Sequence, residues 1–192
     1  SDGQRSLVTL QDHSDLVIEP VTEGRWQDLV QLFEGRGGPM YCWCLLRREP
    51  SKRRAGLDLG GRRALMQDRV DRGEPVGLLG YLDQEPIAWC SVSPRDTYLP
   101  MGGPDEAGDK NVWSIVCFYI QRRHRRKGIA RHLLAAAVEQ AKANGADIVE
   151  AYAVDPDSPS YRFGGFRHLF LQAGFHEVGM AGTRRHVMRL HV

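Results

Sequence analysis

The stretch VWSIVCFYIQRRHRRKGIA, residues 112 to 130, decides how this chain of 192 residues folds. Its first part, Val112 to Ile120, is an apolar run rich in β-branched and aromatic residues, which is typical of a buried strand. A basic segment ending in glycine follows, and a helical pattern begins near Ile129. The first amides of a helix lack intrahelical partners and its N-terminus carries partial positive charge. A basic loop that opens a helix therefore predicts a phosphate site.

The residues after this loop extend the pattern to a second strand. Apolar residues recur at helical spacing from Ile129 to Ala141, and Asn144-Gly145 supplies a stop signal. The run Ile148 to Val154 then suits a buried strand. Strand, loop, helix and strand form a βαβ unit, so we expect parallel strands joined by a right-handed crossover.

The phosphate loop differs from the two common nucleotide-binding fingerprints. No GxGxxG follows a strand, and no GxxxxGK[ST] occurs. Arg125-Arg126-Lys127-Gly128-Ile129-Ala130 instead resembles the acyl-CoA pyrophosphate loop, R/Q-x-x-G-x-G/A, of the GNAT acetyltransferase superfamily. The strand ending Phe118-Tyr119-Ile120, a hairpin from Val76 to Val92 and Ala173-Gly174-Phe175 extend the resemblance from about Leu16 to Leu190.

This resemblance implies both a fold and an activity. The expected fold is a single α/β domain of α+β type, with a central mixed, mostly antiparallel, twisted sheet and helices on both faces. One parallel pair of strands would be splayed at the acyl-CoA site. The implied activity is direct transfer of an acetyl group from acetyl-CoA to a primary amine, more often of a small molecule than of a protein. The alternative from another class is an acyl-CoA-binding or sensory domain that has lost catalysis.

Composition and charge narrow the classes of protein. A chain with 42% apolar and 26% charged residues suits one globular domain, which we expect to span 15–192 after a flexible segment 1–14. No apolar run reaches membrane-spanning length, and no signal peptide is evident. A nucleic-acid-binding domain using Arg122 to Lys127 is a third hypothesis. A net charge of +2 and the lack of aromatic residues in the loop disfavour it.

The four cysteines predict neither a disulfide framework nor a metal site. Cys42 and Cys44 form a C-x-C without a second pair or a nearby His, and Cys90 and Cys117 fall inside strand patterns as small buried residues. We therefore expect a protein of the reducing cytoplasm that holds no metal. We expect it to be a monomer or a homodimer.

The resemblance also assigns the residues that would hold acetyl-CoA. Backbone amides from Arg126 to Ala130 would bind the pyrophosphate, and the edge of the central strand would pair with the peptide-like pantetheine arm. An amide in the Phe118 region would face the thioester oxygen, which becomes negative in the transition state. The implied cofactor-binding set is Cys117, Phe118, Tyr119, Ile120, Arg125, Arg126, Lys127, Gly128, Ile129, Ala130 and Arg131.

Catalytic groups are harder to assign. The strand Val112 to Ile120 has no carboxylate, so Glu150 and Asp155 are the candidate bases, with Asp155 placed beyond the carboxyl end of its strand. The tyrosine that often protonates the departing thiolate in relatives is replaced by Phe170. Tyr152, Tyr161 or a water molecule would then take its place.

Two other residues carry possible chemistry near the phosphate loop. His124 has the chemistry of a base, but its place in the loop favours packing or cofactor contact. Cys117 adjoins the expected thioester site, yet a nucleophilic cysteine needs a lowered pKa and a partnered base, and no Cys/His/Asn arrangement is evident.

The acceptor site should lie in two long loops, 35–50 and 94–110, because long loops in compact domains tend to be functional. Tyr41, Trp43 and Trp89 are candidate substrate-binding residues, although aromatic residues at such positions are as often part of a core. Acidic residues of the second loop would suit a cationic acceptor; they are Asp96, Asp105, Glu106 and Asp109. The sequence leaves the acceptor open among amino acids, polyamines, aminoglycoside-like drugs and protein N-termini.

Overall fold

The computed structural model describes residues 15–105 and 107–192. The expected flexible segment 1–14 and Glu106 therefore lie outside the described residues. The strands are β1 (Val17–Pro20), β2 (Leu78–Leu82), β3 (Glu85–Pro94), β4 (Val112–Ile120), β5 (Ile148–Ala153), β6 (His176–Ala181) and β7 (Arg185–His191). The α-helices are α1 (Trp26–Glu34), α2 (Ser51–Ala55), α3 (Leu59–Asp71), α4 (Ile129–Ala143) and α5 (Arg167–Gln172). Short 3-10 turns are η1 (Glu23–Arg25), η2 (Arg95–Thr97), η3 (Arg122–His124) and η4 (Arg162–Gly164).

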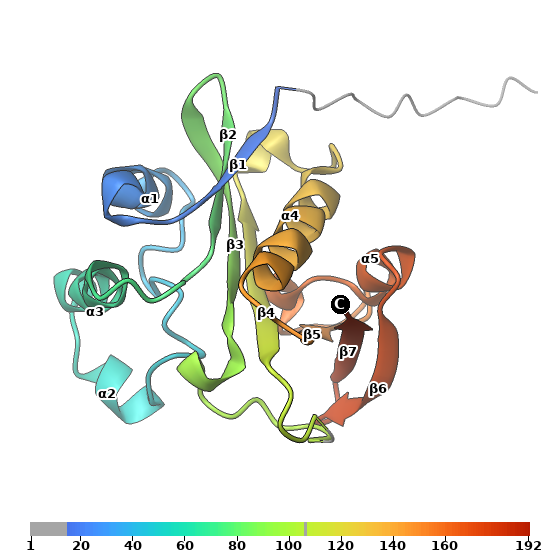
Figure 1. The fold of residues 1–192 in the computed structure, drawn as a ribbon. Coiled ribbons are helices and arrows are strands. Elements are labelled where there is room, and N and C mark those ends of the chain that lie inside the picture. The colour runs from blue at the N-terminus through green and yellow to red at the C-terminus, as the bar shows by residue number, and fades with distance from the viewer. Residues whose placement is uncertain (1–14, 106) are drawn as a thin grey trace, which may run out of the picture.

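The strands form one mixed sheet in the order β1-β2-β3-β4-β5-β7-β6, as Figure 1 shows. Every neighbouring pair is antiparallel except β4 and β5, which are joined through α4 and run parallel. The predicted fold class is thereby confirmed, including the single parallel pair in an otherwise antiparallel sheet.

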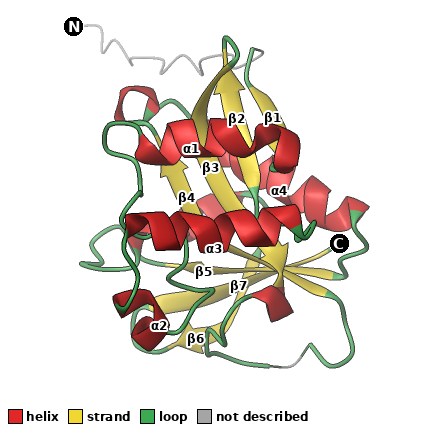
Figure 2. Ribbon diagram, turned by 90° about the vertical axis from the view of Figure 1, so that its left-hand side faces the viewer, coloured by secondary structure: helices red, strands yellow, loops and turns green. Residues whose placement is uncertain are grey.

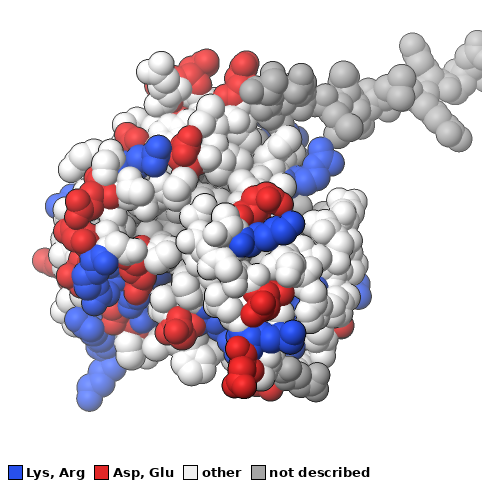
Figure 3. All heavy atoms as spheres, viewed as in Figure 1, with Lys and Arg blue, Asp and Glu red and all other residues white. Residues whose placement is uncertain are grey.

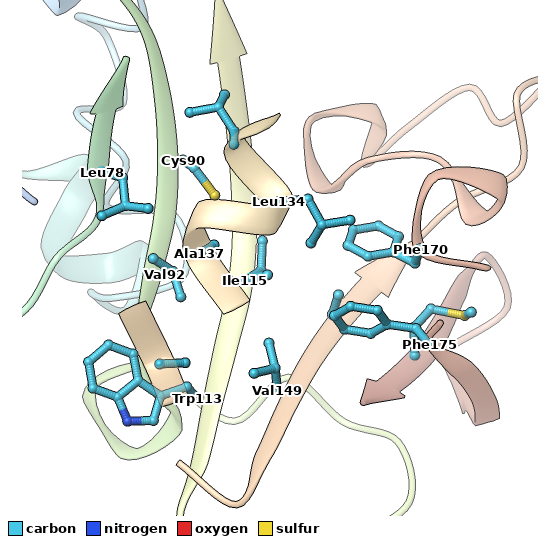
Figure 4. Packing of buried hydrophobic residues seen from close by; sticks show 14 of the residues in the cluster. Leu78, Cys90, Val92, Trp113, Ile115, Leu134, Ala137, Val149, Phe170 and Phe175 are labelled. Atoms are coloured by element: carbon cyan, nitrogen blue, oxygen red, sulfur yellow. The ribbon is translucent and has the colours of Figure 1, made fainter. Parts of the chain in front are cut away.

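Helix α4 covers one face of the sheet because its apolar residues recur along one side. Figure 4 shows Leu134 and Ala137 of α4 against Ile115 of β4 and Val149 of β5. Phe170 of α5 and Phe175, just after it, complete this core beside Leu134. Burying such side chains stabilises the fold by about 1.5–3 kcal/mol each. The βαβ unit is thus fixed rigidly around the loop that joins β4 to α4.

Helices α1 and α3 lie on the other face, where Figure 2 shows them in front of the sheet. An aromatic cluster joins α1 to the sheet and to the loop 35–50. The Trp26 and Trp43 rings stack with centroids 5.5 Å apart, and Phe33 meets Trp89 of β3 edge-on at 5.4 Å. This cluster anchors the first long loop against β3.

Local chemistry sets the bounds of several elements. The Asp58 side chain accepts a hydrogen bond from the Gly61 amide at 2.7 Å and caps α3 directly before Leu59. The hairpin between β2 and β3 turns on Asp83 and Gln84 alone, both left-handed (φ 48° and 67°), which matches the twist of the strands. No described helix is long and apolar enough to cross a membrane.

Candidate active site

Strands β4 and β5 separate partway along their length. Their parallel pairing runs from Val112 opposite Ile148 to Ile115 opposite Ala151, whereas β4 stays paired with β3 as far as Ile120. Within the described residues, no strand pairs with Val116–Ile120 on the β5 side. We call this opening the fork. Its β4 edge is suited to pairing with a peptide-like chain.

A β-bulge lies where the fork begins. Ser91 of β3 faces Cys117, but its neighbour Val92 faces Ile115, so Val116 is an extra residue in β4. Bulges bend a strand and re-aim its backbone groups, and they are frequent next to active sites. The bulge therefore changes the direction of the β4 backbone just before Phe118, the residue expected to face the thioester.

Two glycines let η4 close the base of the fork. A Cβ atom on Gly164 would lie 2.7 Å from the Tyr152 carbonyl oxygen, which is closer than real contacts allow. Gly165 adopts φ 92°, and a Cβ there would meet the Phe170 and Phe118 rings at 3.0 and 3.2 Å. This close fit holds η4 against β4 and β5 where the two strands separate.

The phosphate loop leaves the end of β4 and turns sharply into α4. The Arg125 Nε atom donates to the Ile120 carbonyl oxygen at 2.8 Å, and Arg126 and Gly128 adopt left-handed conformations (φ 60° and 81°). Gly128 is the N-cap of α4 and supplies no side-chain cap, so the first-turn amides remain available to an anion. Arg122, Arg123, Arg125, Arg126, Lys127 and Arg131 are all exposed around this turn.

Burial and the neighbouring Arg123 and Lys127 charges lower the pKa of His124. Its imidazole is therefore neutral near pH 7. Arg123 forms an exposed ion pair with Glu85 at 3.2 Å.

A pocket of about 540 Å³ opens beside the fork; we call it the cysteine pocket. One wall is the β4 segment Val116–Tyr119, the loop 35–50 forms much of the opposite wall, and Arg125 reaches in from the phosphate loop. Cys117 and Tyr119 come from the sheet face that carries α1 and α3. Its lining residues are Gly37, Pro39, Tyr41, Cys42, Cys44, Leu46, Arg47, Arg54, Arg62, Val116, Cys117, Phe118, Tyr119, Arg125 and Phe163.

A second pocket, of about 370 Å³, contains Glu150 and Tyr152, and we call it the glutamate pocket. Glu150 is only 2% exposed, accepts a hydrogen bond from Arg189 Nε at 2.7 Å and accepts another from the Tyr152 hydroxyl. Arg95 lies 3.9 Å from the same carboxylate. Burial, and then the Glu150 carboxylate, raise the pKa of the Tyr152 phenol. Glu150 is thus the counter-ion of Arg189, and Tyr152 stays protonated beside it.

Asp155 and Tyr161, the other predicted catalytic residues, lie outside these two pockets. The Asp155 side chain is 56% exposed and meets the His186 Nε2 atom at 3.1 Å. Tyr161 is 38% exposed, with the Arg47 and Arg185 guanidinium carbons 5.3 and 5.1 Å from its ring centroid. The four predicted catalytic residues are therefore divided among different surroundings.

The three predicted acceptor-binding residues also lie in different surroundings. Tyr41 is exposed and lines the cysteine pocket, whereas Trp43 and Trp89 are fully buried in the aromatic cluster. Burial of two large indole rings stabilises the core, so these tryptophans support the pocket wall from behind. Of the acidic residues in the second loop, Asp105 is paired with Arg95 at 3.1 Å and Asp96 lines the glutamate pocket.

The structure adds one residue that the sequence did not indicate. Arg48 is only 3% exposed and donates to the Cys44 carbonyl oxygen at 2.7 Å, the Val76 carbonyl oxygen at 2.8 Å and the Ser91 hydroxyl at 2.9 Å. Its side chain also lies 3.3 Å from the Cys44 sulfur. The one available signal was the spacing of four residues between Cys44 and Arg48. No group of three or more potential metal ligands is assembled among residues 15–105 and 107–192.

Comparison with known proteins identifies the family. Residues 41–166 match the acetyltransferase (GNAT) family, so the chain belongs to this family. Its members transfer acyl groups from acetyl-CoA. The matched range includes the fork, the phosphate loop and most of the cysteine pocket.

Solved structures share the fold at low sequence identity. A ribosomal-protein-alanine N-acetyltransferase from Brucella melitensis is 19% identical, with a TM-score of 0.55, covering 92% of this chain and 99% of that one. The PaiA N-acetyltransferase from Thermoplasma acidophilum, solved with coenzyme A, is 13% identical with a TM-score of 0.54 and coverages of 92% and 99%. YncA from Salmonella typhimurium, solved with acetyl-CoA, is 17% identical with a TM-score of 0.54 and coverages of 92% and 94%. No curated protein matches the chain.

Proposed function

We propose that this protein transfers the acetyl group of acetyl-CoA to a primary amine of a small molecule. One observation carries the proposal: the fork opens at the Val116 bulge, between the phosphate loop and the cysteine pocket. A donor held along β4 would thus place its thioester where an acceptor in the pocket reaches it.

The donor contacts follow from the backbone. Amides of the first turn of α4, beginning at Ile129, would bind the pyrophosphate, and exposed arginines around Gly128 would supply outer charge. The edge from Phe118 to Ile120 would pair with the pantetheine arm. An amide near Phe118 would donate to the thioester oxygen as negative charge develops there.

The cysteine pocket supports a small, partly anionic acceptor. Its volume of about 540 Å³ lies within the range of about 300–1,000 Å³ that small-molecule sites occupy. Arg47, Arg54 and Arg62 line it, and none of its described lining residues is a carboxylate. We therefore infer an acceptor that carries a carboxylate or phosphate near its amine, such as an amino acid, rather than a polyamine.

Asp155 and Glu150 stay the two candidate bases: Asp155 follows β5 and meets His186, whereas Glu150 lies on β5 in the glutamate pocket and is paired with Arg189. Tyr161 stands near the cysteine pocket through Arg47. The pH-rate profiles of the variants Glu150→Gln and Asp155→Asn, each compared with the wild type, test the two assignments. If neither variant alters the profile, both assignments fail.

The activity itself is tested with acetyl-CoA and two panels of amines, amino acids and polyamines. We expect acetyl-CoA to raise the melting temperature and amino acids to release free coenzyme A. Stabilisation without turnover on any amine would instead favour the sensory domain. Absence of stabilisation would contradict the donor site and leave the nucleic-acid-binding hypothesis. On the face that Figure 3 shows, acidic and basic side chains are interspersed, which does not favour nucleic-acid binding.

A further inference from the structure

Two arginines from distant parts of the chain lie against the same aromatic ring. The guanidinium carbon of Arg47, in the loop 35–50, is 5.3 Å from the centroid of the Tyr161 ring. That of Arg185, the first residue of β7, is 5.1 Å from the same centroid. A guanidinium is attracted to the face of an aromatic ring. The ring therefore holds two positive charges within reach of one small ligand, and we call Arg47, Tyr161 and Arg185 the arginine clamp.

Among residues 15–105 and 107–192, no acidic side chain forms an ion pair with either arginine of the clamp. The Nε atom of Arg47 and the Nε and Nη1 atoms of Arg185 are buried without a hydrogen-bond partner. Burial, and then the neighbouring Arg185 charge, lower the pKa of Arg47. Like charges that repel each other and buried donors without acceptors both cost stability. The arginine clamp therefore lacks a counter-charge, which a bound anion would supply.

Arg47 differs in its partners from the other arginines that line the cysteine pocket. The Nε atoms of Arg54 and Arg125 donate to backbone carbonyl oxygens at 3.0 and 2.8 Å, and an Nη atom of Arg62 does so at 3.2 Å. None of the described residues accepts a hydrogen bond from the Arg47 side chain, which instead contacts the Tyr161 ring. Arg47 is therefore the lining arginine whose donors are left to a ligand.

The arginine clamp lies at the edge of the cysteine pocket. Arg47 and Phe163 both line this pocket, and Phe163 meets the Tyr161 ring edge-on with the ring centroids 6.4 Å apart. Tyr161 is also the N-cap of η4, where it adopts a left-handed conformation (φ 60°) that is uncommon for a residue with a side chain. Such strain persists only where the surroundings fix it, and it clusters at functional sites. The ring that carries both charges is thus fixed next to the base of the fork.

Arg185 lies on the same side of the sheet as the cysteine pocket. Val187, two residues further along β7, packs with Tyr152 and with the partly buried Cys117, which lines the pocket. Side chains two residues apart in a strand point to the same face of a sheet. Arg185 therefore projects from the face of Tyr152 and Cys117, opposite to the face that α4 covers. An acceptor in the pocket can meet charges from both the loop 35–50 and β7.

We propose that the arginine clamp binds an oxyanion of the acceptor, either a carboxylate or a phosphate, and so determines which amines are acetylated. The inference rests on the proposed function and deepens it by naming the residues that select the acceptor. Each guanidinium presents N–H donors in a planar fork that matches both oxyanions. A bound oxyanion neutralises the two charges and joins the loop 35–50 to β7. Tyr161 is then a positioning residue that acts through its ring rather than through its hydroxyl.

The first test compares acceptors that differ in the oxyanion alone. Release of coenzyme A is measured for each amino acid against its neutral carboxamide, and for 2-aminoethyl phosphate against ethanolamine. In at least one of these two series we expect kcat/KM to be about tenfold or more higher for the oxyanion, the effect of one hydrogen bond to a charged group. The series that shows the difference identifies a carboxylate or a phosphate. Equal kcat/KM with and without the oxyanion in both series would overturn the proposal, and this comparison needs only the wild type.

The second test removes the two charges singly and together. Arg47→Met and Arg185→Met should each raise KM for the preferred acceptor about tenfold and leave KM for its neutral counterpart unchanged. The double variant should raise KM by much less than the product of the two single effects, because contacts with one shared group are not additive. Arg36→Met is the matched control, since Arg36 is exposed in the same loop as Arg47 but does not line the pocket. Fully additive effects, or an equal effect in the control, would overturn the shared site.

A third test separates the Tyr161 ring from its hydroxyl. Tyr161→Phe keeps the ring, so we expect KM and kcat to change little. Tyr161→Leu removes the ring and should raise KM about as much as the loss of either arginine. A fall in kcat of about 10²-fold in Tyr161→Phe, the scale on which a general acid acts, would overturn the positioning role.

The outcomes separate this inference from the function on which it rests. Isothermal titration calorimetry with the same acceptors, in the presence of coenzyme A, measures the arginine clamp without turnover. If an oxyanion-bearing amine binds and both single variants weaken its binding, yet no amine is acetylated, the clamp stands and the proposed function fails. If amines are acetylated equally with and without the oxyanion, the proposed function stands and the clamp is refuted. If no amine binds and none is acetylated, both are refuted.

Discussion

The donor side and the acceptor side of the fork are built in different ways. On the donor side, the turn from Arg122 to Ala130 is contiguous in the chain, exposed and dependent on backbone amides. On the acceptor side, Arg48 is buried and contacts groups 28 to 50 residues away, such as Val76 and Tyr98. A site made of local backbone can be recognised in a sequence. A site made of distant side chains appears only when the chain is folded.

The largest expected effect is loss of donor binding in Gly128→Glu. The substitution places a side chain at φ 81° and negative charge at the end of α4 that would face the pyrophosphate. We expect acetyl-CoA affinity to fall by about 10²–10³-fold, as a cost of about 3–4 kcal/mol implies. Isothermal titration calorimetry measures this affinity.

Gly145→Glu is the control for this variant. Gly145 has the nearly identical φ of 82°, but it follows the opposite end of α4. It should cost similar folding stability and leave acetyl-CoA affinity unchanged. Equal affinity loss in both variants would mean that strain rather than the phosphate loop is responsible.

The next effect concerns the base of the fork. In Gly164→Ala the new methyl would lie 2.7 Å from the Tyr152 carbonyl oxygen, so backbone must move. We expect a loss of about 1–3 kcal/mol in the free energy of unfolding, typical of overpacking. Denaturant unfolding measures it, with Gly56→Ala as the control, since a methyl there would lie 3.7 Å from its nearest neighbour. Equal losses in the two variants would contradict the close fit.

A smaller effect should separate binding from chemistry in the cysteine pocket. Arg47→Met removes one positive charge from the lining of the pocket. We expect KM for an anionic acceptor to rise about tenfold with kcat little changed, because one hydrogen bond to a charged group contributes about 1.5–3 kcal/mol at most. Arg72→Met, on the exposed end of α3, is the control. A drop in kcat with unchanged KM would contradict the binding role.

The sequence predicted the donor side in detail for physical reasons. The bounds of β4 and the start of α4 follow from a strand-like run that meets helical spacing at Ile129, and both are confirmed. The acceptor side was not predicted because sequence cannot separate a buried aromatic residue from an exposed one. Tyr41 and Trp43 are two residues apart, yet one lines the pocket and the other is in the core.

The cysteines show the same limit. Cys117 drew attention through its place on the central strand, but the buried positive charge next to a cysteine sulfur is that of Arg48, which lies 3.3 Å from the Cys44 sulfur. The arrangement needs Val76 and Ser91 to orient the guanidinium, and nothing in the local sequence links these residues.

The most direct test of the account is whether donor and acceptor sides meet in one site. The measurement is the rate at which iodoacetamide alkylates Cys42, a partly exposed residue of the cysteine pocket, with and without saturating S-methyl-coenzyme A, which binds as the donor does but carries no acyl group to transfer. We predict slower alkylation in the wild type and an unchanged rate in Gly128→Glu. If the analogue stabilises the wild type and Cys42 reacts at the same rate, the phosphate loop and the cysteine pocket do not share a site.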